Sequence, residues 1–168
     1  MTRNWEDLLG NADRLRAFYS TVPPLAHVVL RSVHFSRYGP TAVLRLDLPK
    51  FPDRPLPEWA EQGCDRLQCH LRFLAVEGLA MRRWEPPVVA DVKLEPLEKR
   101  RIKVDVAGGR TTLSFTSSDF LVVGRVSAFR APAGGAPDRG RHYYAGTMDA
   151  RRYDCVPGAD AGTYHEQF

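Results

Sequence analysis

The sequence predicts a mainly β (α+β) fold: an antiparallel β-sandwich or curled meander sheet with two short N-terminal helices and an extended C-terminal tail. Apolar and polar residues alternate in successive runs between Leu25 and Phe129, as in strands that bury one face. The residues before Leu25 have helical spacing instead. A glycine and proline bridge at 131–137 separates the strand-rich part from a tail that follows no single period.

The two N-terminal helices are predicted from their caps and their one-sided apolar faces. Asn4 and Asn11 are N-cap residue types, and each precedes a segment whose apolar side chains fall on one side. Gly10 is placed to end the first segment, and Pro23–Pro24 ends the second. Because helices this short are not stable alone, we expect them to pack against the sheet.

Eight runs alternate with a period of two and are expected to form the strands. They extend over Leu25–Phe35, Ala42–Leu48, Leu67–Ala75, Leu79–Trp84, Val88–Leu94, Arg101–Val106, Thr111–Phe115 and Phe120–Phe129. In the second and third runs, we assign the polar side chains Arg45, Asp47, Gln68 and His70 to a solvent face.

Glycine and proline mark the connections between these runs. The pair Gly108–Gly109 indicates a tight hairpin. The segment Pro49–Gly63 contains four prolines. Since proline removes the donors of a β-ladder, this segment is predicted to be a loop.

Length and composition predict one domain with an appended tail. With 168 residues and 43% apolar composition, the chain can bury a core, and we place a single antiparallel β domain over residues 1–130. Residues 131–168 are too few for a second domain. We expect them to form a Gly/Pro-linked extension that packs on the first part.

The charge distribution argues against nucleic acid as a partner. Residues 1–130 carry 20 basic and 15 acidic side chains, whereas the tail carries 4 and 5. Nucleic-acid binders concentrate their basic residues in a stripe or run, and this chain has only short clusters such as Lys99–Arg101. These clusters are more typical of solvated turns.

Sequence features also favour a cytoplasmic protein that does not enter a membrane. The apolar runs are far shorter than the roughly 20 residues that a spanning helix needs. The N-terminus carries two acids before any apolar stretch and lacks the features of a secretory signal. Three cysteines without a regular framework fit reduced thiols in a reducing compartment.

No metal site or cofactor is predicted. Cys64, Cys69 and His70 lie close together in the sequence, but Cys69 and His70 are neighbours on one strand and point to opposite faces. We therefore interpret Cys69 as a small core residue and His70 as a solvent-face residue.

Catalysis remains a second possibility, confined to the tail. The tail supplies residue types found in nucleophile–base pairs: His142, Asp149, Cys155 and His165. The chain lacks a Gly-x-Ser-x-Gly elbow, a Gly-x-Gly-x-x-Gly turn and a Walker loop. These residues would act only if the tail covered a cleft, so an enzyme is the less favoured interpretation.

Aromatic and arginine side chains favour a binding role instead, since Trp, Tyr and Arg are enriched at interface hot spots. The candidate partner-binding residues are Trp59, Arg82, Arg83, Tyr143, Tyr144, Arg151 and Tyr153. The competing interpretation is that the tail tyrosines hold the tail against the sheet. Both interpretations stay open for the tail.

Several segments resemble one protein family. The segments are Trp5–Ala12 (WEDLLGNA), Leu15–Tyr19 (LRAFY), Val29–His34 (VLRSVH), Thr41–Leu46 (TAVLRL), Leu67–Phe73 (LQCHLRF) and Phe120–Phe129 (FLVVGRVSAF). Together they resemble the immunity protein 50 family of bacterial polymorphic toxin systems. The resemblance covers most of residues 4–130 and none of the tail.

The resemblance implies a cytoplasmic protein that binds and neutralises a cognate toxin encoded nearby. It specifies no catalytic residue, and no family site transfers residue by residue. Inhibitors of nucleases commonly present acidic surfaces, whereas this chain has a net charge of +4. By electrostatic complementarity, we expect the toxin to be neutral or acidic at the interface. A small-molecule-binding or catalytic derivative of the same fold, with a cleft covered by the tail, is the alternative.

Overall fold

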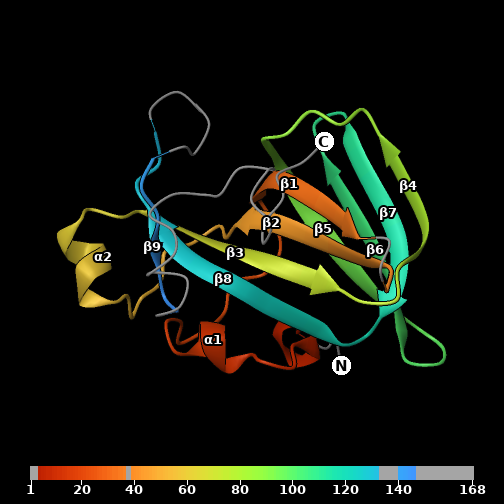
Figure 1. Ribbon diagram of the computed structural model, residues 1–168, viewed down its shortest axis with the longest axis horizontal. Helices are drawn as coiled ribbons and strands as arrows, with labels where there is room; N and C mark the ends of the chain where they lie inside the picture. The colour runs from red at the N-terminus through yellow and green to blue at the C-terminus, as the bar shows by residue number, and fades with distance from the viewer. Residues whose placement is uncertain (1–3, 37–38, 133–139, 147–168) are drawn as a thin grey trace.

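The structure is a computed structural model that describes residues 4–36, 39–132 and 140–146. In this part of the chain, nine strands form one unclosed antiparallel sheet (Figure 1). The strands are β1 (Val28–Ser36), β2 (Thr41–Asp47), β3 (Arg66–Phe73), β4 (Glu77–Arg82), β5 (Val88–Leu97), β6 (Arg101–Gly108), β7 (Thr111–Ser118), β8 (Leu121–Phe129) and β9 (Tyr143–Tyr144). Their order across the sheet is β4-β7-β6-β5-β1-β2-β3-β8-β9.

The sheet curls until its two halves face each other. One half consists of β4, β7, β6 and β5, and the other of β1, β2, β3, β8 and β9. Phe73 of β3 and Phe115 of β7 meet edge to face with ring centroids 5.1 Å apart, although four strands lie between them in the sheet. The apolar core fills the space between the halves. The predicted fold class is thus confirmed as a curled sheet.

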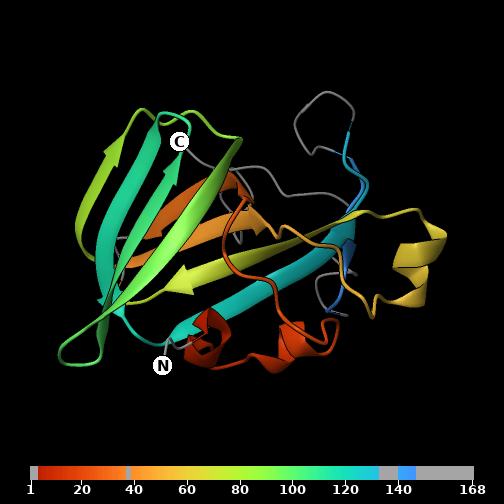
Figure 2. The same ribbon diagram turned by 180° about the vertical axis from the view of Figure 1, so that it is seen from behind.

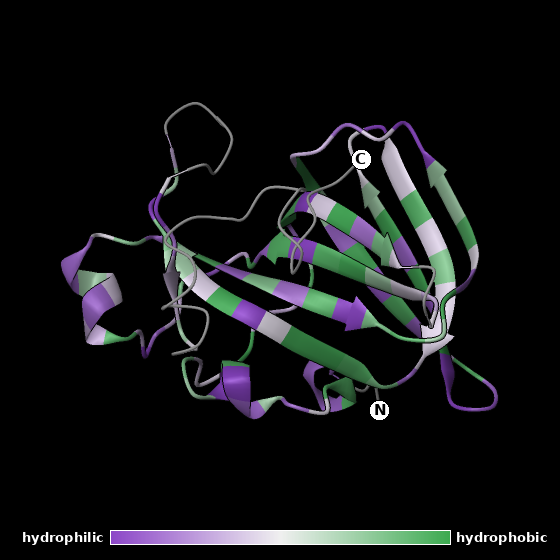
Figure 3. Cartoon of the chain, viewed as in Figure 1, coloured by the Kyte–Doolittle hydropathy of each residue, from purple (hydrophilic) through white to green (hydrophobic). Residues whose placement is uncertain are grey.

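Alternation along the strands produces this core. The inward residues of β6, namely Ile102, Val104 and Val106, are buried, and exposed or half-buried residues stand between them. Figure 3 shows the resulting bands of apolar and polar colour along the strands. Gly109, with a φ of 55°, forms the predicted hairpin between β6 and β7.

Two short helical turns precede the sheet, as predicted, and lie beside β8 (Figure 2). The first, η1 (Trp5–Leu8), is a 3-10 helix, and the second is α1 (Asp13–Arg16). Asn4 occupies the N-cap position of η1 but makes no capping hydrogen bond with its side chain. Ala12 occupies the N-cap position of α1, so the expected role of Asn11 as a cap is wrong.

The prediction that residues 49–63 form only a loop is also wrong, because α2 (Pro57–Glu61) lies within them. Pro57 stands in the first turn of α2 and Leu56 before it is extended. Proline fits the first helical position, where its missing N–H has no intrahelical partner. The prolines therefore exclude a central strand without excluding a helix.

The first strand begins at Val28 rather than at Leu25. His27 has a φ of 58°, which interrupts the extended backbone, and its N–H donates to Asp91 Oδ1 at 2.8 Å. The carbonyl of Leu25 still accepts a hydrogen bond from Val92 N–H at 2.8 Å. This segment thus runs beside β5 before regular pairing starts.

The assignment of Arg45, Asp47, Gln68 and His70 to a solvent face is wrong, because all four are buried. They do lie opposite the apolar core face, as the alternation requires. Burial is compatible with the polarity of Arg45, Asp47 and Gln68 because these three bond to one another and to β1. Arg45 Nε donates to Ser32 Oγ at 3.1 Å, and Gln68 Nε2 donates to Asp47 Oδ1 at 2.9 Å.

Candidate functional site

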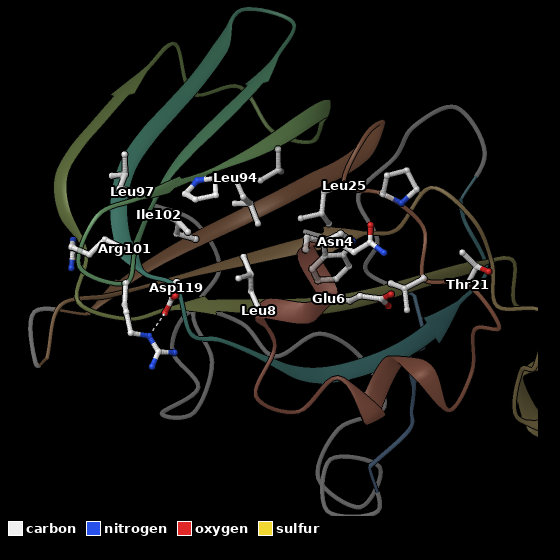
Figure 4. A pocket seen from close by; sticks show the side chains of 16 residues that line it. Asn4, Glu6, Leu8, Thr21, Leu25, Leu94, Leu97, Arg101, Ile102 and Asp119 are labelled. Atoms are coloured by element: carbon white, nitrogen blue, oxygen red, sulfur yellow. Dashed lines mark ion pairs between the residues drawn. The ribbon is translucent and has the colours of Figure 1, made fainter. Parts of the chain in front are cut away.

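A groove of about 1290 Å³ lies between η1, the segment after α1 and the strands β5 and β6 (Figure 4). Leu8 and Leu25 line it from the N-terminal side, and Leu94 and Ile102 line it from the sheet. Within the part of the chain that the structure describes, no cysteine, histidine or serine lines this groove. Its described walls therefore suit an apolar group better than a nucleophile–base pair.

Polar groups stand at both ends of the groove. At one end, the Oε2 atom of Glu6 is buried without a hydrogen-bond partner among the described residues, and Arg16 Nε lies 3.8 Å from it. At the other end, Arg100 Nε lies 3.6 Å from Asp119 Oδ1, with Arg100 largely exposed. The groove is thus apolar along its middle, and each end holds a carboxylate that lies beside an arginine.

A second polar region covers the face of β1, β2 and β3 that is turned away from the core. Its central contact joins Arg31 Nη2 to Asp47 Oδ2 at 2.6 Å, with side chains only 9% and 0% exposed. Gln68 donates to the other oxygen of Asp47. The Arg31 guanidinium also lies 5.7 Å from the ring centroid of Phe129. This arrangement satisfies a buried carboxylate and joins side chains of β1, β2 and β3.

His142, one of the residues of the alternative catalytic interpretation, is buried in this region. Its Nδ1 lies 3.0 Å from Ser127 Oγ, and its ring stacks on Phe129 with centroids 4.5 Å apart. Ser127 is also buried, so neither atom is open to a substrate. The pair holds β9 against β8. Asp149, Cys155 and His165 lie outside the described residues.

Burial shifts the titration of two residues on β3. Desolvation, followed by the charges of Arg125 and Arg45, lowers the pKa of His70 well below 6.5. Desolvation also raises the pKa of the Cys69 thiol to about 12, which makes it a poor nucleophile. The prediction of Cys69 as a core residue is confirmed. Within the described ranges, no three potential metal ligands cluster.

The two edges of the sheet differ in their exposure. The β8 edge is covered by other segments of the chain. Gly10 N–H donates to Leu121 O at 2.9 Å, and Ala145 N–H donates to Val126 O at 2.8 Å. Strand β9 pairs with Ser127 and Ala128. At the other edge, all six residues of β4 are exposed, among them Leu79 (43%) and Met81 (41%). Sequence reasoning missed this edge because local patterns do not give the order of strands.

Comparison with known proteins identifies the family. A model of the immunity protein 50 family matches residues 11–128, which is more than half of the chain. The chain belongs to this family. No curated protein and no solved structure matches it. Among the helices of the described residues, none is long and apolar enough to cross a membrane.

The candidate partner-binding residues of this chain fall into three pairs and one single residue, Tyr143. Arg82 and Arg83 are exposed at the end of β4. Trp59 and Tyr144 are buried, so neither presents its ring to a partner in this structure. Arg151 and Tyr153 lie outside the described residues. Among the candidates that the structure describes, only Arg82 and Arg83 lie together on an open surface.

Tyr143 links the last described segment to α2. Its carbonyl accepts a hydrogen bond from Trp59 Nε1 at 3.0 Å, and its hydroxyl donates to Gln62 Oε1 at 3.2 Å. The Arg141 guanidinium lies 5.0 Å from its ring centroid. Since the ring is half-buried, Tyr143 both holds the segment 140–146 in place and leaves part of its surface to solvent.

Proposed function

We propose that this immunity protein binds a cognate bacterial toxin in the cytoplasm and neutralises it by stoichiometric occlusion. Membership of the immunity protein 50 family is the observation that carries the proposal. The described chemistry agrees with a binding role, because its thiol on β3 is unreactive and its Ser127–His142 pair is buried. The toxin is held and covered, and no bond in it is broken.

The interface of the toxin is expected to be neutral or acidic. Arg82 and Arg83 are exposed and take part in no ion pair among the described residues. Unpaired surface arginines attract carboxylates and raise the rate of encounter with an acidic protein. Tyr143, Arg151 and Tyr153 are proposed as further contacts from the C-terminal segment.

The test uses the toxin domain encoded beside the gene for this chain. Bacteria that express this domain should survive only when the immunity protein is co-expressed, and the two proteins should co-purify in a fixed ratio. A matched immunity protein from another strain serves as the control for specificity. The proposal would be contradicted if the bacteria survive although the two proteins form no complex, or if a complex forms and the toxin stays active.

Tail contacts are tested by truncation after Gly146 rather than after Arg130. The longer form keeps β9, whose tyrosines and His142 pack against β8 and α2. Loss of toxin binding with an unchanged melting temperature would assign contacts to the region that holds Arg151 and Tyr153. Unchanged binding would show that Arg151 and Tyr153 do not contribute to toxin binding.

Small-molecule binding is the second candidate, and the groove beside η1 is the observation that favours it. Its lining comes from the N-terminal segment, β5, β6 and their connections, and includes none of residues 140–146. It differs in this respect from the tail-covered cleft that the sequence suggested. Trp5 lines the groove, so a ligand should change tryptophan fluorescence in the wild type and not in Trp5→Phe. Retention of a small molecule without any toxin partner would favour this second function.

A further inference from the structure

The β4 edge is the open edge of the described sheet. Along the β8 edge, the side-chain amide of Asn11, the N–H of Gly10 and strand β9 occupy backbone groups of β8. On its outer side, β4 has no partner among the described residues, and its inner side pairs with β7 alone. An uncovered edge presents a row of backbone donors and acceptors to which another strand can pair.

Two apolar side chains lie along this open edge. Ala80 pairs with Ser114 and Met81 pairs with Leu113, so Met81 lies on the same side of the sheet as the buried Leu113. The register of β4 against β7 shifts between Glu77 and Ala80, and Gly78 has a φ of 64°. Leu79 follows this irregularity and stands two residues before Met81, on the same side of the strand. Both are more than two fifths exposed. A strand added beside β4 would cover them and extend the apolar face of the sheet.

The C-terminal end of β4 is basic. Arg82 and Arg83 are exposed there, and the carbonyl of Arg83 accepts a hydrogen bond from the Thr111 hydroxyl at 2.7 Å. Thr111 follows Arg110, which is also exposed, so three arginines gather at this end of the edge. Glu85, which follows Arg82 and Arg83 in the sequence, offsets only one of these three positive charges, so this end of the edge keeps an excess of positive charge. Carboxylates on an incoming strand would compensate that excess.

We propose that the toxin docks by adding an extended segment to the open edge of β4. Apolar side chains of that segment cover Leu79 and Met81, and its carboxylates pair with Arg82 and Arg83. This inference rests on the proposed function and names the surface that performs it. Backbone pairing supplies binding energy that tolerates variation in sequence, and the arginine cluster selects an acidic partner.

Hydrogen exchange and binding measurements test the proposal with the same toxin domain. In the complex, backbone amides of β4 should exchange more slowly than in the free chain. Leu79→Ser with Met81→Ser, and separately Arg82→Glu with Arg83→Glu, should each weaken binding at least about tenfold. Because these side chains are exposed, the melting temperature should stay near that of the wild type.

A double variant on β5 is the matched control. Val89→Ser with Lys93→Glu removes one exposed apolar side chain and reverses one exposed charge on a different strand, and it should bind the toxin as the wild type does. Raising the salt concentration should slow association of the wild type more than that of the Arg82→Glu, Arg83→Glu variant, which has lost the attraction.

The outcomes separate this inference from the function on which it rests. A tight wild-type complex with unprotected β4 amides and unaffected variants would overturn the docking site and leave toxin binding in place. Absence of any wild-type complex would overturn both. Dimerisation of the free chain that the Leu79→Ser, Met81→Ser variant abolishes would assign the β4 edge to a second copy and overturn the proposal.

Discussion

Asn11 acts as a short substitute for a β-strand beside Val123. Its Nδ2 donates to Val123 O at 2.6 Å, and its Oδ1 accepts from Val123 N–H at 2.9 Å. The carboxamide thus reproduces the donor and acceptor of a neighbouring peptide group at the edge of β8. Together with the bond from Gly10 N–H to Leu121 O, it joins the N-terminal segment to the sheet.

Asn11→Ala should therefore destabilise the fold. The substitution removes both hydrogen bonds and leaves two partly buried backbone groups of Val123 without them, at a cost of about 1–3 kcal/mol. Asn4→Ala is the control, since the Asn4 side chain makes no capping hydrogen bond. Urea denaturation checks both variants. Equal stability of Asn11→Ala and Asn4→Ala would show that this contact contributes nothing.

The same residue shows how far sequence reasoning reaches. Asparagine before a helical segment is usually a cap, and the local pattern contains no sign that Val123, over a hundred residues away, would bind its side chain. Alternation, in contrast, is a local property, and it predicted all eight strands from β1 to β8. Contacts within one element are readable from sequence, and contacts between distant elements are not.

The polar face of β2 and β3 illustrates the second limit. Period-two alternation places Asp47 and Gln68 on the face opposite the leucines, and the structure confirms this placement. It does not say whether the face is open or covered. The exposed β4 edge escaped prediction for a related reason, because the order of strands depends on long-range pairing.

Asp47→Ala should be strongly destabilising. Asp47 is fully buried and accepts hydrogen bonds from Arg31 and Gln68, so its removal leaves the Arg31 guanidinium without this partner, at a cost of about 3–5 kcal/mol. The matched control is Asp7→Ala. Asp7 pairs with Arg16 at 3.1 Å on the surface, where such pairs contribute less than about 1 kcal/mol. If thermal denaturation shows that Asp47→Ala and Asp7→Ala lose similar amounts of stability, the buried ion pair does not contribute more than the surface pair.

Gly108→Ala should disturb the pairing of β5 with β6. The added Cβ would overlap the carbonyl oxygen of Val89 and the Cα of Ala90, which belong to backbone and cannot rotate away. We expect a loss of about 1–3 kcal/mol. Gly124→Ala in β8 is the control, because no atom lies within 4 Å of its added Cβ and it should change stability by less than about 1 kcal/mol. Chemical denaturation that ranks the two variants in the opposite order would reject this packing argument.

His70 should make stability depend on pH below neutrality. Burial lowers its pKa in the folded state well below 6.5, and the positive charges of Arg125, Arg45, Arg72 and His142 add to the effect. Above pH 6.5 the imidazole is neutral in both states, so its contribution is fully present. As the pH falls below 6.5, the unfolded chain takes up a proton that the folded chain excludes.

The free energy of unfolding should therefore fall by about 1.4 kcal/mol per pH unit through this one group, until the folded pKa is reached. His70→Asn should remove this contribution, so that the free energy of unfolding depends on pH less steeply than in the wild type, by about 1.4 kcal/mol per pH unit. The substitution also changes stability by an amount that is independent of pH. His27→Asn is the control, since His27 is exposed and asparagine accepts its positive φ. Denaturation series between pH 7 and about pH 5 measure the three slopes. If the slope of His70→Asn equals that of the wild type, His70 takes up its proton in the folded state as readily as in the unfolded chain. Burial on β3 would then not keep the imidazole neutral, and this prediction would be wrong.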